Sequence, residues 1–270
     1  MINNAKNDYY IQNQILAASR EASMVQKNVV RTILLALAGI WPLAAQGQTP
    51  LVFNVASRAP YVTQDRKGFL DLLVAEMFRR VGEMAEMTVY PNASARALAL
   101  ANQGRDDGVA LRVKGLEKKY PNLVIIPESI LKNYFVAYAK RSDIKVSGFA
   151  ALKSYSVGHI IGWRLFEVKL KEFGFETVTR VKNGEQLFSL LENDRVDVVL
   201  YERWLGLALA KRRKIKIHTL GPPLAQPEMF LYLHVRHKAL IGKAAQALAA
   251  MKHDGSYKSI VDRTLTPLLQ

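Results

Sequence analysis

The sequence predicts an α/β protein of two lobes, each an open, mostly parallel sheet flanked by helices. Residues 187–191 have helical apolar spacing, a polar turn follows, and an apolar run at 196–200 ends at polar residues that include Glu202. Residues 96–112 repeat this order and end at Arg112. Continuous apolar strands between polar turns are typical of sheets covered on both faces. Because ligands bind beyond the carboxyl ends of such strands, we expect Glu202 and Arg112 to face one cleft.

The composition limits the possible chemistry. The chain has 270 residues, half of them hydrophobic, which is enough for one large or two small domains with cores. It has no cysteine, which excludes disulfides, thiolate metal sites, cysteine nucleophiles and the lipid-carrying cysteine of bacterial lipoproteins. The five histidines lack metal-ligand spacing and are assigned no site; they are His159, His218, His234, His237 and His253. We expect no metal, no cofactor and no catalytic residue.

The net charge of +15 is compatible with nucleic acid, an anionic membrane or an anionic small molecule as partner. The basic residues are scattered, and the one dense cluster, at 211–214, follows an apolar segment. That position is typical of a helix C-terminus, where the helix dipole favours cations. No nucleic-acid motif accompanies the cluster, so a generally basic surface is the preferred interpretation and nucleic acid is not an expected partner.

Residues 1–47 are predicted to be an N-terminal extension and a secretory signal. Lys27 and Arg31 precede an apolar run at 33–45, and small residues follow it. This layout matches a cleaved signal peptide starting at Met24, and the run is short for a membrane span. An uncleaved membrane anchor is the alternative.

The remaining elements follow from short apolar runs and from the residues that interrupt them. Pro60, Gly162 and the Gly-Pro-Pro sequence at 221–223 each end a predicted strand, and Ser94 is a suitable helix N-cap. The predicted strands are 51–56, 88–90, 108–111, 122–127, 134–139, 156–161, 175–181, 196–200, 214–220 and 229–235. The predicted helices are 69–81, 96–101, 149–153, 163–173, 187–191, 204–210, 241–251 and 257–265.

Three stretches resemble one protein family. Residues 251–260, MKHDGSYKSI, are similar to the C-terminal M-x-x-D-G-[ST]-Y-x-x-I of the polar-amino-acid class of bacterial extracytoplasmic solute-binding proteins. Gly68-Phe69 after 59–61, and Asp197 with an acid five positions later, match as well. The resemblance covers about residues 51–268. It implies the type II periplasmic binding fold, and it places Glu202 where the family binds the ammonium group of an amino acid.

The departures from the family concern its ligand-binding positions. Leu70 and Leu72 stand where the family helix has acids, and Lys118 stands where it has the arginine that grips the ligand carboxylate. Arg112 is the nearer candidate for that role. Arg58 replaces a stacking ring, and Gly162-Trp163 replaces a glycine–threonine pair. These changes favour a ligand with more negative charge than an ordinary amino acid.

Each candidate residue also has a purely structural interpretation. Glu202 could pair with Arg203, Arg112 could form a structural ion pair, and Tyr61 and Trp163 could pack in a core. Arg96 lies in a first helical turn, where the dipole disfavours a cation, which favours a role in the cleft. The candidate ligand-binding residues are Arg58, Tyr61, Arg96, Arg112, Gly162, Trp163 and Glu202.

The resemblance implies a monomeric periplasmic binding protein rather than an enzyme. Lobe 1 is expected at 51–141 plus 229–270 and lobe 2 at 142–228, with crossings near 139–142 and 227–231. Hinge closure would capture a small carboxylate-bearing solute for the permease of an ABC transporter or for a sensor. The alternative is a periplasmic enzyme similar to cyclohexadienyl dehydratases, with Glu202 or Glu128 as general acid.

Overall fold

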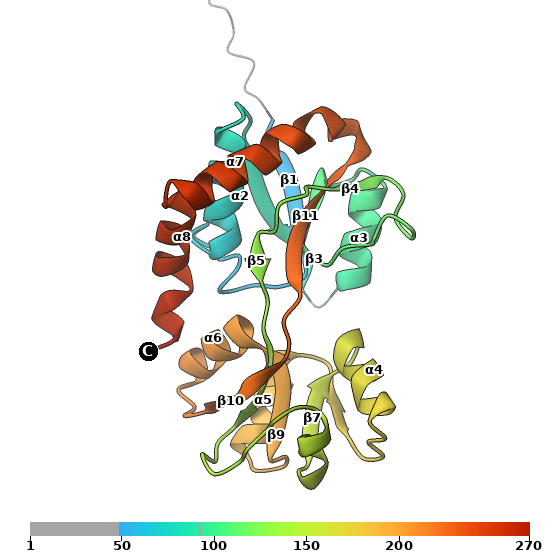
Figure 1. Cartoon of the computed structure of the whole chain (residues 1–270), viewed down its shortest axis with the longest axis vertical. Coiled ribbons are helices and arrows are strands. Elements are labelled where there is room, and N and C mark those ends of the chain that lie inside the picture. Colours follow the sequence, from blue (N-terminus) through green and yellow to red (C-terminus); the bar gives the residue numbers. More distant parts are fainter. Residues whose placement is uncertain (1–48, 92) are drawn as a thin grey trace, which may run out of the picture. The chain divides into compact units, whose positions relative to one another are not determined.

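The computed structural model describes residues 49–91 and 93–270 (Figure 1). The predicted signal peptide, with its start at Met24, lies outside the described residues. Within the part of the chain that is described, no helix is both long and apolar enough to cross a membrane. The described elements form two sheets, each flanked by helices, and we call each sheet with its helices a lobe.

The first lobe is built on a sheet with the strand order β2-β1-β3-β11-β4, and β5 also pairs with β11. Its strands are β1 (Leu51–Val55), β2 (Ala85–Val89), β3 (Gly108–Arg112), β4 (Leu123–Ile125), β5 (Leu131–Lys132) and β11 (Glu228–His234). Strand β1 pairs in parallel with β2 and β3, whereas β11 is antiparallel to its neighbours. The carboxyl ends of β1, β2 and β3 therefore share one edge of the sheet.

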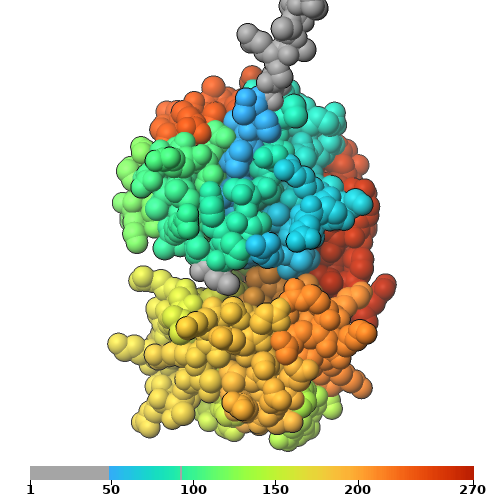
Figure 2. Space-filling model, turned by 180° about the vertical axis from the view of Figure 1, so that it is seen from behind, coloured from blue at the N-terminus to red at the C-terminus, as the bar shows by residue number. Residues whose placement is uncertain are grey.

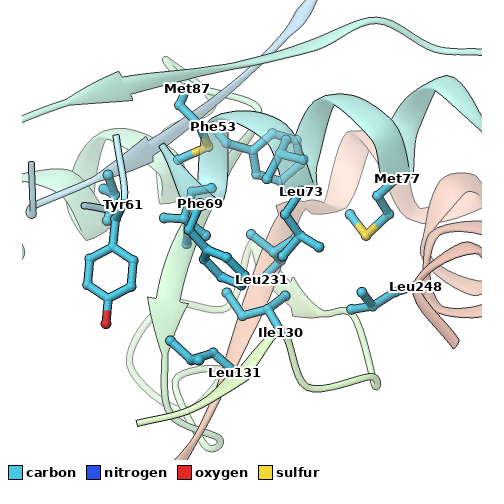
Figure 3. Close-up of a cluster of buried hydrophobic side chains, with 14 of the residues drawn as sticks. Phe53, Tyr61, Phe69, Leu73, Met77, Met87, Ile130, Leu131, Leu231 and Leu248 are labelled. Atoms are coloured by element: carbon cyan, nitrogen blue, oxygen red, sulfur yellow. The ribbon is translucent and has the colours of Figure 1, made fainter. Parts of the chain in front are cut away.

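Helices α2 (Phe69–Arg79), α3 (Ser94–Asn102), α7 (Ile241–His253) and α8 (Ser256–Thr264) belong to the first lobe, with the short helices η2 (Val235–Leu240) and η3 (Thr266–Leu268). Leu73 and Met77 of α2, Leu231 of β11 and Leu248 of α7 are fully buried in one cluster. Figure 3 shows these side chains meeting between the helices and the sheet. The helical spacing that predicted α2 and α7 thus reflects one shared core.

The second lobe is built on a sheet with the strand order β10-β6-β9-β7-β8. Its strands are β6 (Phe135–Ala139), β7 (Val157–Ile160), β8 (Thr179–Val181), β9 (Val198–Glu202) and β10 (His218–Ala225). Its helices are η1 (Ala150–Ser154), α4 (Arg164–Glu172), α5 (Gly184–Glu192) and α6 (Arg203–Arg213). Strand β7 pairs in parallel with β8 and β9, whereas β6 is antiparallel to both of its neighbours, β9 and β10. Both sheets are therefore mixed, with antiparallel strands beside the segments that join the lobes.

The first crossing between the lobes lies earlier than the sequence predicted. Strand β6 pairs with β9 and β10, so it belongs to the second lobe, although 134–139 was expected in lobe 1. The chain crosses at 133–134 instead of 139–142, and it returns at 226–227 between β10 and β11. The two crossing segments run close together in Figure 1. Strand pairing decides this boundary, and pairing partners cannot be identified from the apolar run itself.

Several local expectations are corrected. Strand β10 continues through Gly221-Pro222-Pro223 to Ala225, because it lies at the sheet edge, where proline costs no ladder hydrogen bond. Ser94 does not cap α3; its Oγ accepts a hydrogen bond from Arg112 instead. The basic cluster does close a helix as predicted, since α6 ends at Arg213 and Lys214 adopts a left-handed conformation with φ 56°.

The C-terminal motif has a structural role in this chain. Asp254 accepts a hydrogen bond from the Ser256 backbone amide at 2.9 Å and one from Arg80 at 2.6 Å. Arg80 lies just after α2 and also bonds Glu76. The motif therefore joins the turn between α7 and α8 to the end of α2.

Candidate functional site

The carboxyl ends of strands from both lobes meet at one boundary. Tyr61, which follows β1, and Trp204, which follows β9, belong to the same buried apolar cluster. Figure 2 shows a groove between the two lobes, bordered by the segments near residues 90–115 and 160–180. The first segment follows β2 and contains the end of β3 at Arg112, and the second contains the end of β7 at Ile160. The groove therefore lies where parallel α/β sheets bind ligands.

Glu202 ends β9 as predicted, but its side chain turns onto its own helix. It is 1% exposed, and it is the N-cap residue of α6. Its Oε1 accepts from the Trp204 backbone amide at 3.0 Å, and its Oε2 accepts from Leu205 at 2.9 Å. Burial raises the pKa of Glu202 to about 7 against the lowering effect of these amides. Both carboxylate oxygens are thus engaged by backbone donors.

Tyr61 is packed in the core at the boundary between the lobes. It is 1% exposed, and its hydroxyl lies 3.5 Å from Asn133 Oδ1, at the first crossing. Burial and the charge of Glu202 raise the pKa of Tyr61 well above its usual value. Trp204 is 8% exposed in the same cluster, and its indole nitrogen is buried without a partner among the described residues. The start of α6 is thus anchored in the core of the first lobe.

Arg112 ends β3 and has open hydrogen-bonding capacity. Its Nη1 donates to Ser94 Oγ at 2.7 Å. Its Nε and Nη2 are buried and have no hydrogen-bond partner among the described residues. Burial lowers the pKa of Arg112 from 12.5 to about 10, so it remains a cation at neutral pH. Because buried polar groups are nearly always paired in proteins, these two donors are the clearest indication of a ligand contact in the groove region.

Gly162 and Trp163 follow β7 and are both already in contact with neighbouring side chains. The Gly162 backbone amide, where the family resemblance expects a ligand carboxylate, donates to Glu167 Oε1 at 2.8 Å. Trp163 stacks on Phe166 with ring centroids 6.0 Å apart and contacts the Tyr201 ring at 4.8 Å. The indole packs among second-lobe aromatic side chains and remains partly exposed.

Arg58 lies in the segment after β1, Arg96 lies in the first turn of α3, which follows β2, and both are exposed. The Arg96 guanidinium lies 5.6 Å from the centre of the Tyr90 ring. Together with Arg112, they place three arginines along the edge where β1, β2 and β3 end. The structure thus gathers four of the seven predicted residues at this edge, including Tyr61, while Gly162, Trp163 and Glu202 lie at the ends of β7 and β9.

Sequence reasoning missed three contributors to this boundary. Glu167 accepts from Gly162, Trp204 anchors α6, and Ser94 holds Arg112. Ser94 was noticed only as a helix cap. Glu167 lies five residues after Gly162 in the first turn of α4, where an acid is favoured by the helix dipole. An acid in the first turn of a predicted helix is the sequence feature that could have identified Glu167.

A separate cavity of about 430 Å³ also lies between the lobes. It is lined by residues of the 59–68 segment, of α6 and of the C-terminal segment 263–268. None of the seven predicted residues lines it. The described residues contain no group of three or more histidine, aspartate or glutamate side chains placed to bind a metal ion.

Comparison with known sequences gives little information. No protein-family model matches the chain. A curated, uncharacterized protein of Shewanella oneidensis is 24% identical over 169 residues, which are 60% of this chain and 64% of that protein. The chain therefore matches less than two thirds of the length of this relative.

Comparison with solved structures is informative about the fold. An ancestral arginine-binding protein, solved with glutamine and with arginine, has a TM-score of 0.63 at 19% identity, over 80% of this chain and 96% or 97% of that one. A histidine kinase sensor domain with similarity to periplasmic binding proteins has a TM-score of 0.66 at 16% identity, over 80% and 96%. The GluR0 ligand-binding core of Nostoc punctiforme, in complex with L-glutamate, has 0.64 at 18%, over 80% and 99%. The chain has the two-lobed type II periplasmic binding fold.

Proposed function

We propose that this protein is a binding protein that captures a small carboxylate-bearing solute between its lobes. The observation that carries the proposal is Arg112, a partly buried arginine at the end of β3 whose Nε and Nη2 are buried without a partner among the described residues. A guanidinium can make two parallel charged hydrogen bonds to one carboxylate. The solved structures of similar fold include several amino-acid-binding proteins, which supports a small polar solute.

Capture would use the boundary between the lobes as a hinge. Only the segments at 133–134 and 226–227 connect the two sheets along the described chain. A ligand that contacts both lobes favours the closed arrangement by the free energy of its additional contacts there. Tyr61 and Trp204 would then close the buried side of the groove. Trp204 is a built-in fluorescent reporter of this motion, because opening would expose its ring to water.

The proposed setting is the periplasm, reached through the predicted N-terminal signal. The partner would be the permease of an ABC transporter, since substrate-binding proteins of such transporters share the fold. A sensor role is the second candidate, because a histidine kinase sensor domain is among the structures of similar fold. A chain that works as a monomer would serve either role.

An enzyme on the same scaffold is the remaining alternative. The pKa of Glu202, raised by burial to about 7, would suit a general acid. However, both of its oxygens accept backbone hydrogen bonds and the residue is 1% exposed, so a substrate does not reach it in this arrangement. Incubation with prephenate or arogenate tests this alternative, and product formation would support it.

The binding proposal is tested by a thermal-shift screen of amino acids, dicarboxylates and sugar acids, followed by calorimetry. A ligand that binds only the folded state raises its melting temperature. A hydrogen bond to a charged group contributes about 1.5–3 kcal/mol, so Arg112→Ala should weaken binding by about tenfold to a hundredfold. Arg105→Ala is the matched control, because it removes one exposed arginine from the same lobe. If both variants bind like the parent protein, Arg112 is not the ligand contact.

A further inference from the structure

We infer that the solute is a carboxylic acid without an ammonium group, rather than an amino acid. This inference rests on the proposed function and narrows its ligand class. It is based on the contacts already made by the acids near the strand ends, on the unpartnered donors of Arg112 and on the positive charge of the first-lobe edge.

The group best placed to bind an ammonium ion is already engaged. An ammonium needs an acceptor that it can reach, and Glu202 is 1% exposed with each side-chain oxygen already accepting a backbone hydrogen bond, from Trp204 or Leu205. Releasing this carboxylate would remove the cap of α6 and leave two backbone donors at its first turn without their partner. Glu202 is therefore held as part of the fold in this arrangement.

The neighbouring acids are also engaged. Glu167 accepts from the Gly162 amide. Glu117, in the segment after β3, is half-buried beside the Tyr232 hydroxyl. Of these, Glu167 is exposed and uses one oxygen for Gly162, so it is the rival ammonium acceptor that an experiment must exclude.

The cations of the same region are less engaged. Among the described residues, two donors of Arg112 have no partner, and neither Arg58 nor Arg96 has an ion pair. A site with available cations, and with acids that already accept hydrogen bonds, favours an anion over a zwitterion of the same size. An ammonium group buried there would lack a partner, which lowers affinity by about tenfold to a hundredfold relative to the deaminated acid.

The experiment uses pairs of acids that differ only in the ammonium group. Glutarate is compared with L-glutamate, succinate with L-aspartate, and 3-phenylpropionate with L-phenylalanine, by thermal shift and then by calorimetry near pH 7.5. The expected result is that at least one deaminated acid binds at least tenfold more tightly than its amino acid. Arg112→Ala should weaken that binding by at least tenfold, and Arg105→Ala should not.

Two variants separate the possible ammonium acceptors. Glu167→Gln and Glu202→Gln should each bind the best deaminated acid within about threefold of the parent. If an amino acid binds more tightly than its deaminated partner, the inference is overturned and the proposed function stands. A selective loss of amino-acid binding in either variant would then identify the acceptor. If no acid of either kind binds, both the inference and the carboxylate-binding function are overturned.

Discussion

Removing the charge of Arg112 should stabilise the ligand-free protein. Burial lowers the pKa of Arg112 from 12.5 to about 10, and this difference corresponds to a free-energy cost of about 3 kcal/mol for the charged form at 1.36 kcal/mol per pH unit. The hydrogen bond to Ser94 offsets about 1 kcal/mol of any gain from its removal. Arg112→Met keeps an apolar stem of similar length, so we expect a gain of about 2 kcal/mol.

The measurement is thermal unfolding in a buffer without carboxylate or phosphate, because an anion bound to Arg112 would stabilise the parent protein. For domains of about 150–250 residues, 1 kcal/mol moves Tm by about 2–4 °C, so Arg112→Met should melt about 4–8 °C higher. The gain should be constant between pH 7 and 9. A base with a lowered folded pKa destabilises the fold at every pH below about 10, and this cost is relieved only as the pH rises toward 12.5.

Two controls make this result specific. Arg105→Met removes an exposed arginine of the same lobe and should leave Tm within about 1 °C. Arg112→Lys keeps a cation at the buried position and should not produce the gain. If Arg112→Met melts at or below the parent temperature, the guanidinium is not an uncompensated buried charge, and the argument for a ligand contact is refuted as well.

Two further outcomes concern the second lobe. Gly206→Ala should destabilise the protein by more than about 1 kcal/mol in urea unfolding, because the added Cβ would lie 2.3 Å from the Tyr138 ring. The control is Gly242→Ala in the first lobe, which has open space around its Cβ and should be neutral or slightly stabilising. Equal effects of the two substitutions would contradict the packing of Gly206 against Tyr138. Burial raises the pKa of Glu202 to about 7, so its charged form is unfavourable in the folded protein above pH 7. As the pH falls from 8 to 5, the free energy of unfolding of the parent should therefore rise by up to about 3 kcal/mol relative to that of Glu202→Gln. A difference that does not change with pH would be inconsistent with this pKa.

The fold could be predicted from the sequence because its elements are locally marked. Polar turns separate the apolar runs, and the carboxyl ends of β3 and β9 were placed correctly at Arg112 and Glu202. The lobe of β6 could not be predicted, because the run at 134–139 is equally suited to either sheet and its hydrogen bonds to β9 and β10 decide. The sequence of a short apolar strand does not indicate which distant strands it pairs with.

The candidate site shows a similar limit at the level of one side chain. An acid that ends a strand immediately before a helix has two competing partners, a ligand beyond the strand end and the free backbone amides of the helix. The sequence places Glu202 at this junction without deciding between them. In the structure, the amides of Trp204 and Leu205 each take one oxygen, and Trp204 fixes that turn by packing in the first-lobe core. Among residues 49–91 and 93–270, Arg112 has no equivalent partner for its Nε and Nη2. Position at a strand end therefore predicted both Glu202 and Arg112 as ligand contacts, whereas the hydrogen bonds of the structure favour only Arg112. A site that offers a cation, and whose acids already accept hydrogen bonds, is the reason to propose a carboxylic acid without an ammonium group as the solute.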